Sequence, residues 1–184
     1  PIGFYSKLYH EVRASCVGCP SGRYGLTTAG GAGAADVASG CKECPEGYWQ
    51  NAVDNCRGCP GGRWSDVKEL SNKAECQSCN AGKYGSIIGA ASEASCTLCS
   101  AGKFGVLVGQ DNPDSCTNCP TGFYQKLLGQ PYCLPCNPGT TAGNAGMSEC
   151  TICEPGKFMN NTGSTASFCR WAPTGRYVSA GATS

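Results

Sequence analysis

One stretch of this chain decides its fold: Cys116-Thr117-Asn118-Cys119-Pro120-Thr121-Gly122-Phe123-Tyr124. Its frame is C-x-x-C-P-x-G-x-aromatic, and the chain contains eight C-x-x-C pairs set in frames of this kind. A ninth copy begins at Cys169 and has Ala172 in place of its second cysteine, but it keeps Gly175 and Tyr177. Because a motif that recurs along a chain is the signature of a repeat architecture, the frame predicts one small structural unit per copy.

The composition excludes a large apolar core. The chain has 184 residues and 17 cysteines, whereas Leu, Ile, Val and Phe together supply about one residue in seven. A cysteine content of about 9% is typical of chains that are held together by disulfides, which form outside the cell. The net charge of +1 gives no reason to expect a nucleic-acid or acidic-membrane partner. No run of about 18 apolar residues is present to predict a membrane span.

Glycine and aromatic residues carry the repeat to both ends of the chain. Glycine stands three positions after the place of the second cysteine, which is Ala172 in the last copy and would precede Pro1 in the first. These glycines are Gly3, Gly22, Gly47, Gly62, Gly82, Gly102, Gly122, Gly139, Gly156 and Gly175. An aromatic residue stands five positions after that cysteine, at Tyr5, Tyr24, Trp49, Trp64, Tyr84, Phe104, Tyr124, Phe158 and Tyr177. The predicted repeats are 19–43, 44–58, 59–78, 79–98, 99–118, 119–135, 136–152 and 153–171, with partial repeats at 1–18 and 172–184.

The broken ninth copy indicates how the cysteines pair. If the second cysteine of each pair bonds the first cysteine of the next pair, Ala172 needs no thiol, because no later cysteine follows it. The predicted disulfides are then Cys19–Cys41, Cys44–Cys56, Cys59–Cys76, Cys79–Cys96, Cys99–Cys116, Cys119–Cys133, Cys136–Cys150 and Cys153–Cys169. Cys16 stays unpaired within this segment, and we expect its partner upstream of Pro1, in a longer precursor or parent protein.

Two other uses of these cysteines remain open at this stage. Successive C-x-x-C pairs have the spacing found in zinc ribbons. Zinc sites would use the cysteines in groups of four, however, and Cys169 would then be a stray ligand. A thioredoxin-like redox motif needs a βαβ context and one such pair. Neither use accounts for eight copies in series, so we expect structural disulfides, no metal and no cofactor.

Each predicted unit is a disulfide-closed loop rather than a packed domain. In Cys-Pro-x-Gly, Pro suits the second position of a type I turn and Gly the fourth. The aromatic residue then begins a short extended segment, and we expect it to cover a neighbouring disulfide and to supply most of the apolar burial. The expected fold is small, disulfide-rich and mostly irregular with short β-hairpins. It is an elongated linear array in which each unit contacts mainly its sequence neighbours.

The frame resembles a known class of extracellular repeat. Cys119-Pro-Thr-Gly122-Phe-Tyr124 and Cys59-Pro-Gly-Gly62-Arg-Trp64 are similar to the ephrin-receptor-like cysteine-rich repeats and to the single-disulfide submodule of tumour necrosis factor receptors. Long arrays of this kind resemble those in large surface proteins of protists and algae. The resemblance implies an extracellular, elongated and non-enzymatic protein. The chain departs from the pattern where Pro or the aromatic residue is replaced, at Asn80, Ser100, Asn137, Glu154 and Thr141.

Catalytic and ion-binding groups are scarce. The single histidine, His10, has no nucleophile or acidic partner beside it in a recognisable pattern, so no enzyme is predicted. Asp111-Asn112-Pro113-Asp114 lacks the further oxygen ligands of a calcium loop and is interpreted as a hydrogen-bonded turn. Asn160-Asn161-Thr162 is an N-glycosylation sequon, which makes Asn160 a candidate glycan acceptor.

Three consecutive repeats share a pair of apolar residues followed by glycine. These apolar doublets are Ile87-Ile88, Leu107-Val108 and Leu127-Leu128. If the doublets are extended, one residue of each should point inward and the other outward, which would form a self-association ridge; alternatively, both are buried between repeats. We therefore expect an extracellular structural protein, a rod-like segment of a cell-surface or secreted filament that binds copies of itself or other extracellular proteins. The alternative is a receptor or adhesion ectodomain that binds a protein ligand.

Overall fold

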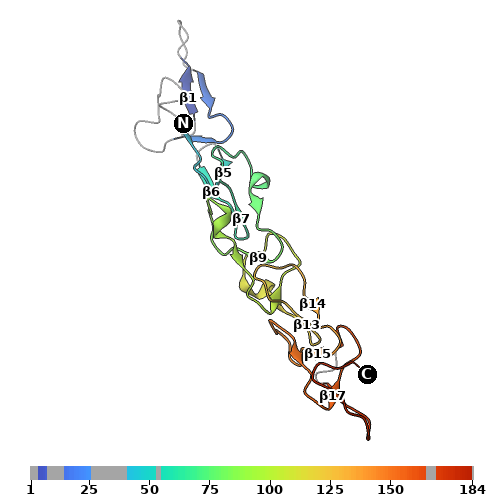
Figure 1. Cartoon of the computed structure of the whole chain (residues 1–184). Helices are drawn as coiled ribbons and strands as arrows, with labels where there is room; N and C mark the ends of the chain where they lie inside the picture. Colours follow the sequence, from blue (N-terminus) through green and yellow to red (C-terminus); the bar gives the residue numbers. More distant parts are fainter. Residues whose placement is uncertain (1–3, 8–14, 26–40, 53–54, 165–168, 184) are drawn as a thin grey trace. The chain divides into compact units, whose positions relative to one another are not determined.

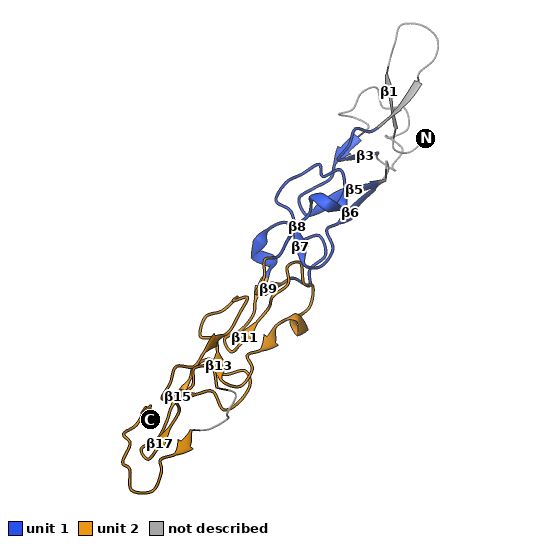
Figure 2. Cartoon of the chain, turned by 90° about the vertical axis from the view of Figure 1, so that its right-hand side faces the viewer, with its two compact units in different colours: residues 1–79, 85–96 blue, residues 80–84, 97–184 orange. Residues whose placement is uncertain are grey.

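The computed structural model describes residues 4–7, 15–25, 41–52, 55–164 and 169–183, and the side chains of 4–7, 15–18 and 52 are not among what it describes. The chain divides into two compact units, shown in Figure 2. Unit 1 comprises Pro1–Cys79 and Gly85–Cys96, and unit 2 comprises Asn80–Tyr84 and Thr97–Ser184. The division therefore falls within the repeat at 79–98. His10, the side chain of Cys16 and residues 26–40 lie outside the described residues.

Both units are built from two-stranded antiparallel hairpins, nine in all among the described residues (Figure 1). In unit 1 the pairs are β1 (Phe4–Lys7) with β2 (Ser15–Gly18), β3 (Arg23–Gly25) with β4 (Cys41–Glu43), β5 (Tyr48–Ala52) with β6 (Asn55–Gly58), and β7 (Arg63–Trp64) with β8 (Gln77–Ser78). In unit 2 they are β9 (Lys83–Tyr84) with β10 (Thr97–Leu98), β11 (Lys103–Phe104) with β12 (Thr117–Asn118), β13 (Phe123–Tyr124) with β14 (Leu134–Pro135), β15 (Thr140–Thr141) with β16 (Thr151–Ile152), and β17 (Lys157–Phe158) with β18 (Arg170–Trp171).

Helix is confined, within the described ranges, to three single 3-10 turns, which lie in successive repeats. They are η1 (Lys73–Glu75), η2 (Glu93–Ser95) and η3 (Pro113–Ser115). The sequence-based prediction of a disulfide-rich, mostly irregular repeat array with short hairpins is therefore confirmed. No described helix has the length and apolarity that a membrane crossing needs.

The turn that begins each hairpin differs from the predicted one by one residue. In the repeat at 119–135, the N–H of Phe123 donates to the carbonyl oxygen of Pro120 at 3.0 Å. Pro120 is thus the first residue of the turn, and Gly122 is the third, with φ of 84°. Such a positive φ at the third position is a property of type II turns, so the prediction of a type I turn was wrong. Asn80 forms the same hydrogen bond with Lys83, because the first position does not require Pro.

Sulfur dominates the buried interior. Most of the buried apolar residues are disulfide-bonded cysteines. Among the frame aromatic residues whose side chains are described, Tyr177 is exposed and the others are only half-buried. Trp49 illustrates the arrangement, because its ring packs against Leu70 and the disulfide Cys59–Cys76 of the following repeat. The expectation that an aromatic ring covers a neighbouring disulfide therefore holds at Trp49. The expectation that the rings supply most of the apolar burial in each repeat stays a prediction.

Backbone hydrogen bonds join each repeat to the next within a unit. The N–H of Gly102 donates to the carbonyl oxygen of Gln125 at 2.7 Å. The N–H of Gln125 in turn donates to the carbonyl oxygen of Met147 at 3.2 Å. These three residues belong to three successive repeats. The same pairing recurs elsewhere, for example from Gly47 to Ser65 and from Gly122 to Ala142. Main-chain hydrogen bonds thus form a regular part of the stacking between repeats.

Contact also reaches the repeat after next, which the sequence analysis did not predict. A Cβ added to Gly102 would lie 2.0 Å from the carbonyl oxygen of Gly146, two repeats further along the chain. A Cβ added to Gly122 would lie 2.2 Å from the carbonyl oxygen of Ser164. Glycine is therefore needed at these positions for two reasons, positive φ and close backbone approach.

Candidate association surface

Each apolar doublet is held by a loop whose backbone turns at a glycine. These loop glycines directly follow the doublet or its equivalent and have φ between 62° and 82°: Gly89, Gly109, Gly129, Gly146, Gly163 and Gly181. The N–H of Gly129 donates to the carbonyl oxygen of Cys99 at 2.8 Å, and the N–H of Gly163 donates to the carbonyl oxygen of Cys136 at 2.9 Å. The same hydrogen bond to a cysteine carbonyl oxygen is made by Gly89, Gly146 and Gly181, so these loops are structurally equivalent. Gly109 shares their positive φ and their place in the sequence, so residues in the same register can be compared in its loop too.

All six residues of the doublets are exposed. Their exposed fractions lie between 55% for Leu128 and 71% for Ile88. Both sequence-based expectations were therefore wrong: no doublet has one residue inward, and none is buried between repeats. The physical reason is local, because Ile88, Val108 and Leu128 lie in turns or bends rather than in extended strands. The alternation of side chains that applies to strands does not apply to them.

The buried side chain of Gln125 holds the backbone of the doublet Leu127-Leu128 by a hydrogen bond. Its side chain is 2% exposed, and both ends of the amide are hydrogen-bonded. Oε1 accepts from the N–H of Leu127 at 3.0 Å, and Nε2 donates to the carbonyl oxygen of Tyr132 at 2.8 Å. Gln125 could not be predicted from the sequence, because a polar residue next to an aromatic residue gives no signal of burial.

The candidate glycan acceptor lies in an equivalent loop of unit 2. Asn160, Asn161 and Thr162 are all exposed, and Thr162 directly precedes the loop glycine Gly163. A hollow of about 100 Å³ lies beside the sequon and is lined in part by Phe158. Asn160 therefore lies where the side chain is open to solvent and where Ser86, Val106 and Lys126 stand in the doublet-bearing repeats.

The cysteines whose side chains are described form eight disulfides in series. They join Cys19–Cys41, Cys44–Cys56, Cys59–Cys76, Cys79–Cys96, Cys99–Cys116, Cys119–Cys133, Cys136–Cys150 and Cys153–Cys169, the pairs that the broken ninth copy indicates. The sulfurs are thus placed in pairs rather than in groups of four. Within the described ranges, no cluster of three or more histidine, cysteine or acidic side chains is arranged to hold a metal ion.

The acidic turn at 111–114 is held by its own hydrogen bonds. Asn112 Oδ1 accepts from the N–H of Asp114 at 2.9 Å, and Asn112 Nδ2 donates to Asp111 Oδ1 at 3.1 Å. Asn112 is in this way the N-cap of η3. The interpretation of this segment as a hydrogen-bonded turn is confirmed.

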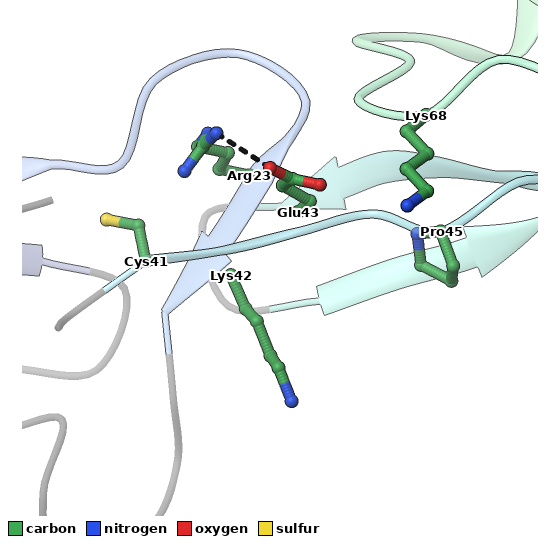
Figure 3. A pocket seen from close by; sticks show the side chains of 6 residues that line it. All are labelled: Arg23, Cys41, Lys42, Glu43, Pro45 and Lys68. Carbon is green, nitrogen blue, oxygen red and sulfur yellow. Dashed lines mark hydrogen bonds and ion pairs between the residues drawn. The ribbon is translucent and has the colours of Figure 1, made fainter. Parts of the chain in front are cut away.

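Charged side chains line the hollow at the first complete repeat. Figure 3 shows Arg23 pointing toward Glu43, with Nη2 3.1 Å from Oε1, while Lys42 and Lys68 extend from the backbone around it. The hollow has a volume of about 450 Å³. A similar hollow of about 260 Å³ adjoins Thr141, the one frame position without an aromatic ring. These hollows are open depressions where the hairpin of one repeat meets the turn of the next.

A second ion pair lies near the end of unit 2. Lys157 Nζ donates to Glu154 Oε2 at 2.8 Å and lies 4.7 Å from the ring centre of Trp171. The hydrogen bond from Lys157, together with its positive charge, lowers the pKa of the Glu154 carboxyl. Trp171 and Tyr177 are exposed by 74% and 87%, which makes them the most exposed aromatic residues among those described.

Comparison with known proteins agrees with this geometry over part of the chain. Residues 105–146 match a family model described as tyrosine-protein kinase ephrin type A/B receptor-like. No curated protein sequence matches the chain. The serial disulfides and this match indicate an extracellular segment. The chain is a tandem array of single-disulfide, cysteine-rich repeats, and its residues 105–146 are ephrin-receptor-like.

Proposed function

We propose that this chain is a structural segment of an extracellular filament or surface assembly, in which copies of the chain associate through the apolar doublets. The observation that carries the proposal is the exposure of both residues in every doublet. Exposed apolar residues that recur at the same place in consecutive repeats are an unusual use of surface in a chain with so few aliphatic residues. On this proposal the protein catalyses no reaction.

A second copy is the occupant that the chemistry favours. Each copy offers the same apolar side chains, so two copies can bury leucine and valine against leucine and valine. The net charge of +1 produces little long-range repulsion between copies, and a net charge near zero favours association. In unit 2, Leu107-Val108 and Leu127-Leu128 stand in the same register of consecutive repeats, which suits a repeated contact between copies.

The receptor or adhesion alternative is favoured by a different feature. Trp171 and Tyr177 are exposed aromatic residues in the last repeats described, and aromatic residues are enriched where proteins bind other proteins. On this alternative, the rings would contact a protein ligand, and the doublets would contribute little.

Sedimentation velocity over a concentration series separates these proposals. The wild-type chain is expected to associate as its concentration rises, and Leu127→Ser/Leu128→Ser is expected to weaken association at least tenfold. Lys126→Ser, which changes the exposed neighbour of the same doublet, serves as the matched control. Electron microscopy of the native material should show filaments or a layer. A wild-type chain that stays monomeric at high concentration, with no assemblies in native material, would exclude the structural proposal.

A further inference from the structure

We propose that Asn160 carries an N-linked glycan and that this glycan limits the association surface to the repeats that precede it in the sequence. The second part rests on the function proposed above, and the first part does not. Equivalent loops in unit 2 carry both features: the doublet-bearing loops occur in the repeats at 99–118 and 119–135, and the sequon occurs in the repeat at 153–171.

The loops are equivalent because their backbones make the same bond. The N–H groups of Gly129, Gly146 and Gly163 each donate to a cysteine carbonyl oxygen, at 2.8, 2.8 and 2.9 Å. All three glycines have positive φ, between 62° and 82°. Counting back from the loop glycine, Asn160 in one repeat therefore corresponds to Lys126 in another.

The two residues before the loop glycine change from apolar to mostly polar after the repeat at 119–135. Leu127-Leu128 precedes Gly129, whereas Asn144-Ala145 precedes Gly146 and Asn161-Thr162 precedes Gly163. The exposed positions are thus occupied by apolar side chains in the first case and by mostly polar side chains in the others. A surface that buries leucine against a second copy cannot extend through the later repeats, because asparagine and threonine would be desolvated without apolar gain.

One of these polar loops contains the sequon and is therefore a candidate modification site. Asn160-Asn161-Thr162 is the one N-x-Ser/Thr sequence in the chain, and all three side chains are exposed. Transfer from a polyprenyl-pyrophosphate-linked oligosaccharide forms a bond between Asn160 Nδ2 and C1 of the first sugar. The bond from C1 to the pyrophosphate oxygen breaks, the amide nitrogen loses one proton, and polyprenyl pyrophosphate leaves.

A glycan at this register position would exclude a second copy sterically. N-linked sugars are bulky and strongly hydrated, and this one is attached three residues before the loop glycine. The corresponding position in the repeat at 119–135 is Lys126, directly beside Leu127 and Leu128. The glycan and the doublets thus occupy neighbouring register positions in equivalent loops, and contact between copies is confined to the repeats before the sequon.

The modification is tested by intact mass after secretion from a eukaryotic cell line. Peptide N-glycosidase should lower the mass of the wild-type chain by one glycan. Asn160→Gln and Thr162→Ala should abolish the shift, whereas Asn161→Gln keeps the sequon and should retain it. A secreted wild-type chain whose mass does not change on treatment overturns the first part of the proposal, whatever its association.

The limit on the association surface is tested by moving the sequon into a doublet loop. Lys126→Asn/Leu128→Thr places an N-x-Thr sequence over positions 126–128, in the register of the natural sequon, and Lys126→Gln/Leu128→Thr is the matched variant without it. We expect the first variant to gain a glycan and to associate at least tenfold more weakly than the second, as measured by sedimentation velocity. Asn160→Gln should associate within about twofold of wild type. Equal association of the two doublet-loop variants, or no glycan on the introduced asparagine, overturns this limit.

Discussion

Arg23 Nη2 lies 2.5 Å from Glu69 Oε1, and this ion pair joins two repeats of unit 1 that are not adjacent in the sequence. Glu69 has φ of 60° and is the one described non-glycine residue with positive φ. It occupies the place that a loop glycine takes in the later repeats, and its N–H donates to the carbonyl oxygen of Cys44 at 3.0 Å. The unit thus tolerates an unfavourable backbone conformation at a position where the side chain forms an ion pair.

Replacing Glu69 with glycine should stabilise unit 1. The left-handed conformation costs a non-glycine residue about 1–2 kcal/mol, whereas a partly exposed ion pair contributes about 0.2–1 kcal/mol. We therefore expect Glu69→Gly to raise the free energy of unfolding by about 1 kcal/mol in urea denaturation. Glu69→Gln keeps the backbone cost, removes the charge and should lower stability slightly. A destabilising Glu69→Gly would mean that the ion pair outweighs the backbone term.

Gly102 and Gly175 form a matched pair for testing contact with the repeat after next. Both have positive φ, but an added Cβ meets the Gly146 carbonyl oxygen at Gly102 and nothing within 4 Å at Gly175. Gly175→Ala should cost only the left-handed backbone term of about 1–2 kcal/mol. Gly102→Ala should cost about 1–3 kcal/mol more, from overpacking. Hydrogen exchange at Gly146 should be faster in Gly102→Ala alone, and equal effects in both variants would contradict the contact.

The buried amide of Gln125 should contribute more to stability than the partly exposed amide of Gln130. Gln125→Met leaves the N–H of Leu127 and the carbonyl oxygen of Tyr132 without their partner, which costs about 1–3 kcal/mol. Gln130→Met removes a hydrogen bond from Nε2 to the carbonyl oxygen of Leu128 on the surface and should change stability by less than about 0.5 kcal/mol. Urea unfolding of both variants measures the difference. Similar costs would show that burial does not set the value of this bond.

Removing one disulfide should destabilise its own repeat without unfolding the chain at large. Cys99 and Cys116 are separated by 17 residues, for which the chain-entropy model gives about 3 kcal/mol. In Cys99→Ser/Cys116→Ser, hydrogen exchange should accelerate most within residues 99–118. Peptide mapping of the wild-type chain without reduction should recover the eight linked pairs. Stoichiometric zinc in the purified protein, or any other set of linked peptides, would contradict this organisation.

The Glu154 carboxyl should titrate abnormally because of Lys157. Its pKa is lowered by the hydrogen bond and the charge of Lys157, so the ion pair contributes stability above the carboxyl's unfolded pKa. That contribution is lost as the pH falls through the folded pKa. In a ¹³C NMR titration, Lys157→Met should raise the pKa of Glu154, whereas Lys157→Arg should leave it lowered. An unchanged pKa in Lys157→Met would contradict the assigned cause.

Local features of the array could be predicted from the sequence, and features between repeats could not. The frame around Cys119 and Gly122 predicted disulfide-closed hairpins, since the turn and the loop closure lie within about 20 residues of chain. The turn type was wrong because Pro120 suits more than one position of a turn, and only the hydrogen bond from Phe123 decides between them. Gln125 gave no signal, because its partners are backbone atoms.

By itself, the sequence determined that this chain is a cysteine-rich repeat array held together by disulfides. The spacing of the cysteines limits which pairs can bond covalently, and that spacing is visible in the amino-acid sequence. Only the tertiary structure decided that both residues of each apolar doublet face solvent and that Gly102 lies against the carbonyl oxygen of Gly146. Repeats stack here through main-chain N–H and C=O groups. Every residue type except proline carries both groups, so stacking of this kind leaves almost no trace in the amino-acid sequence.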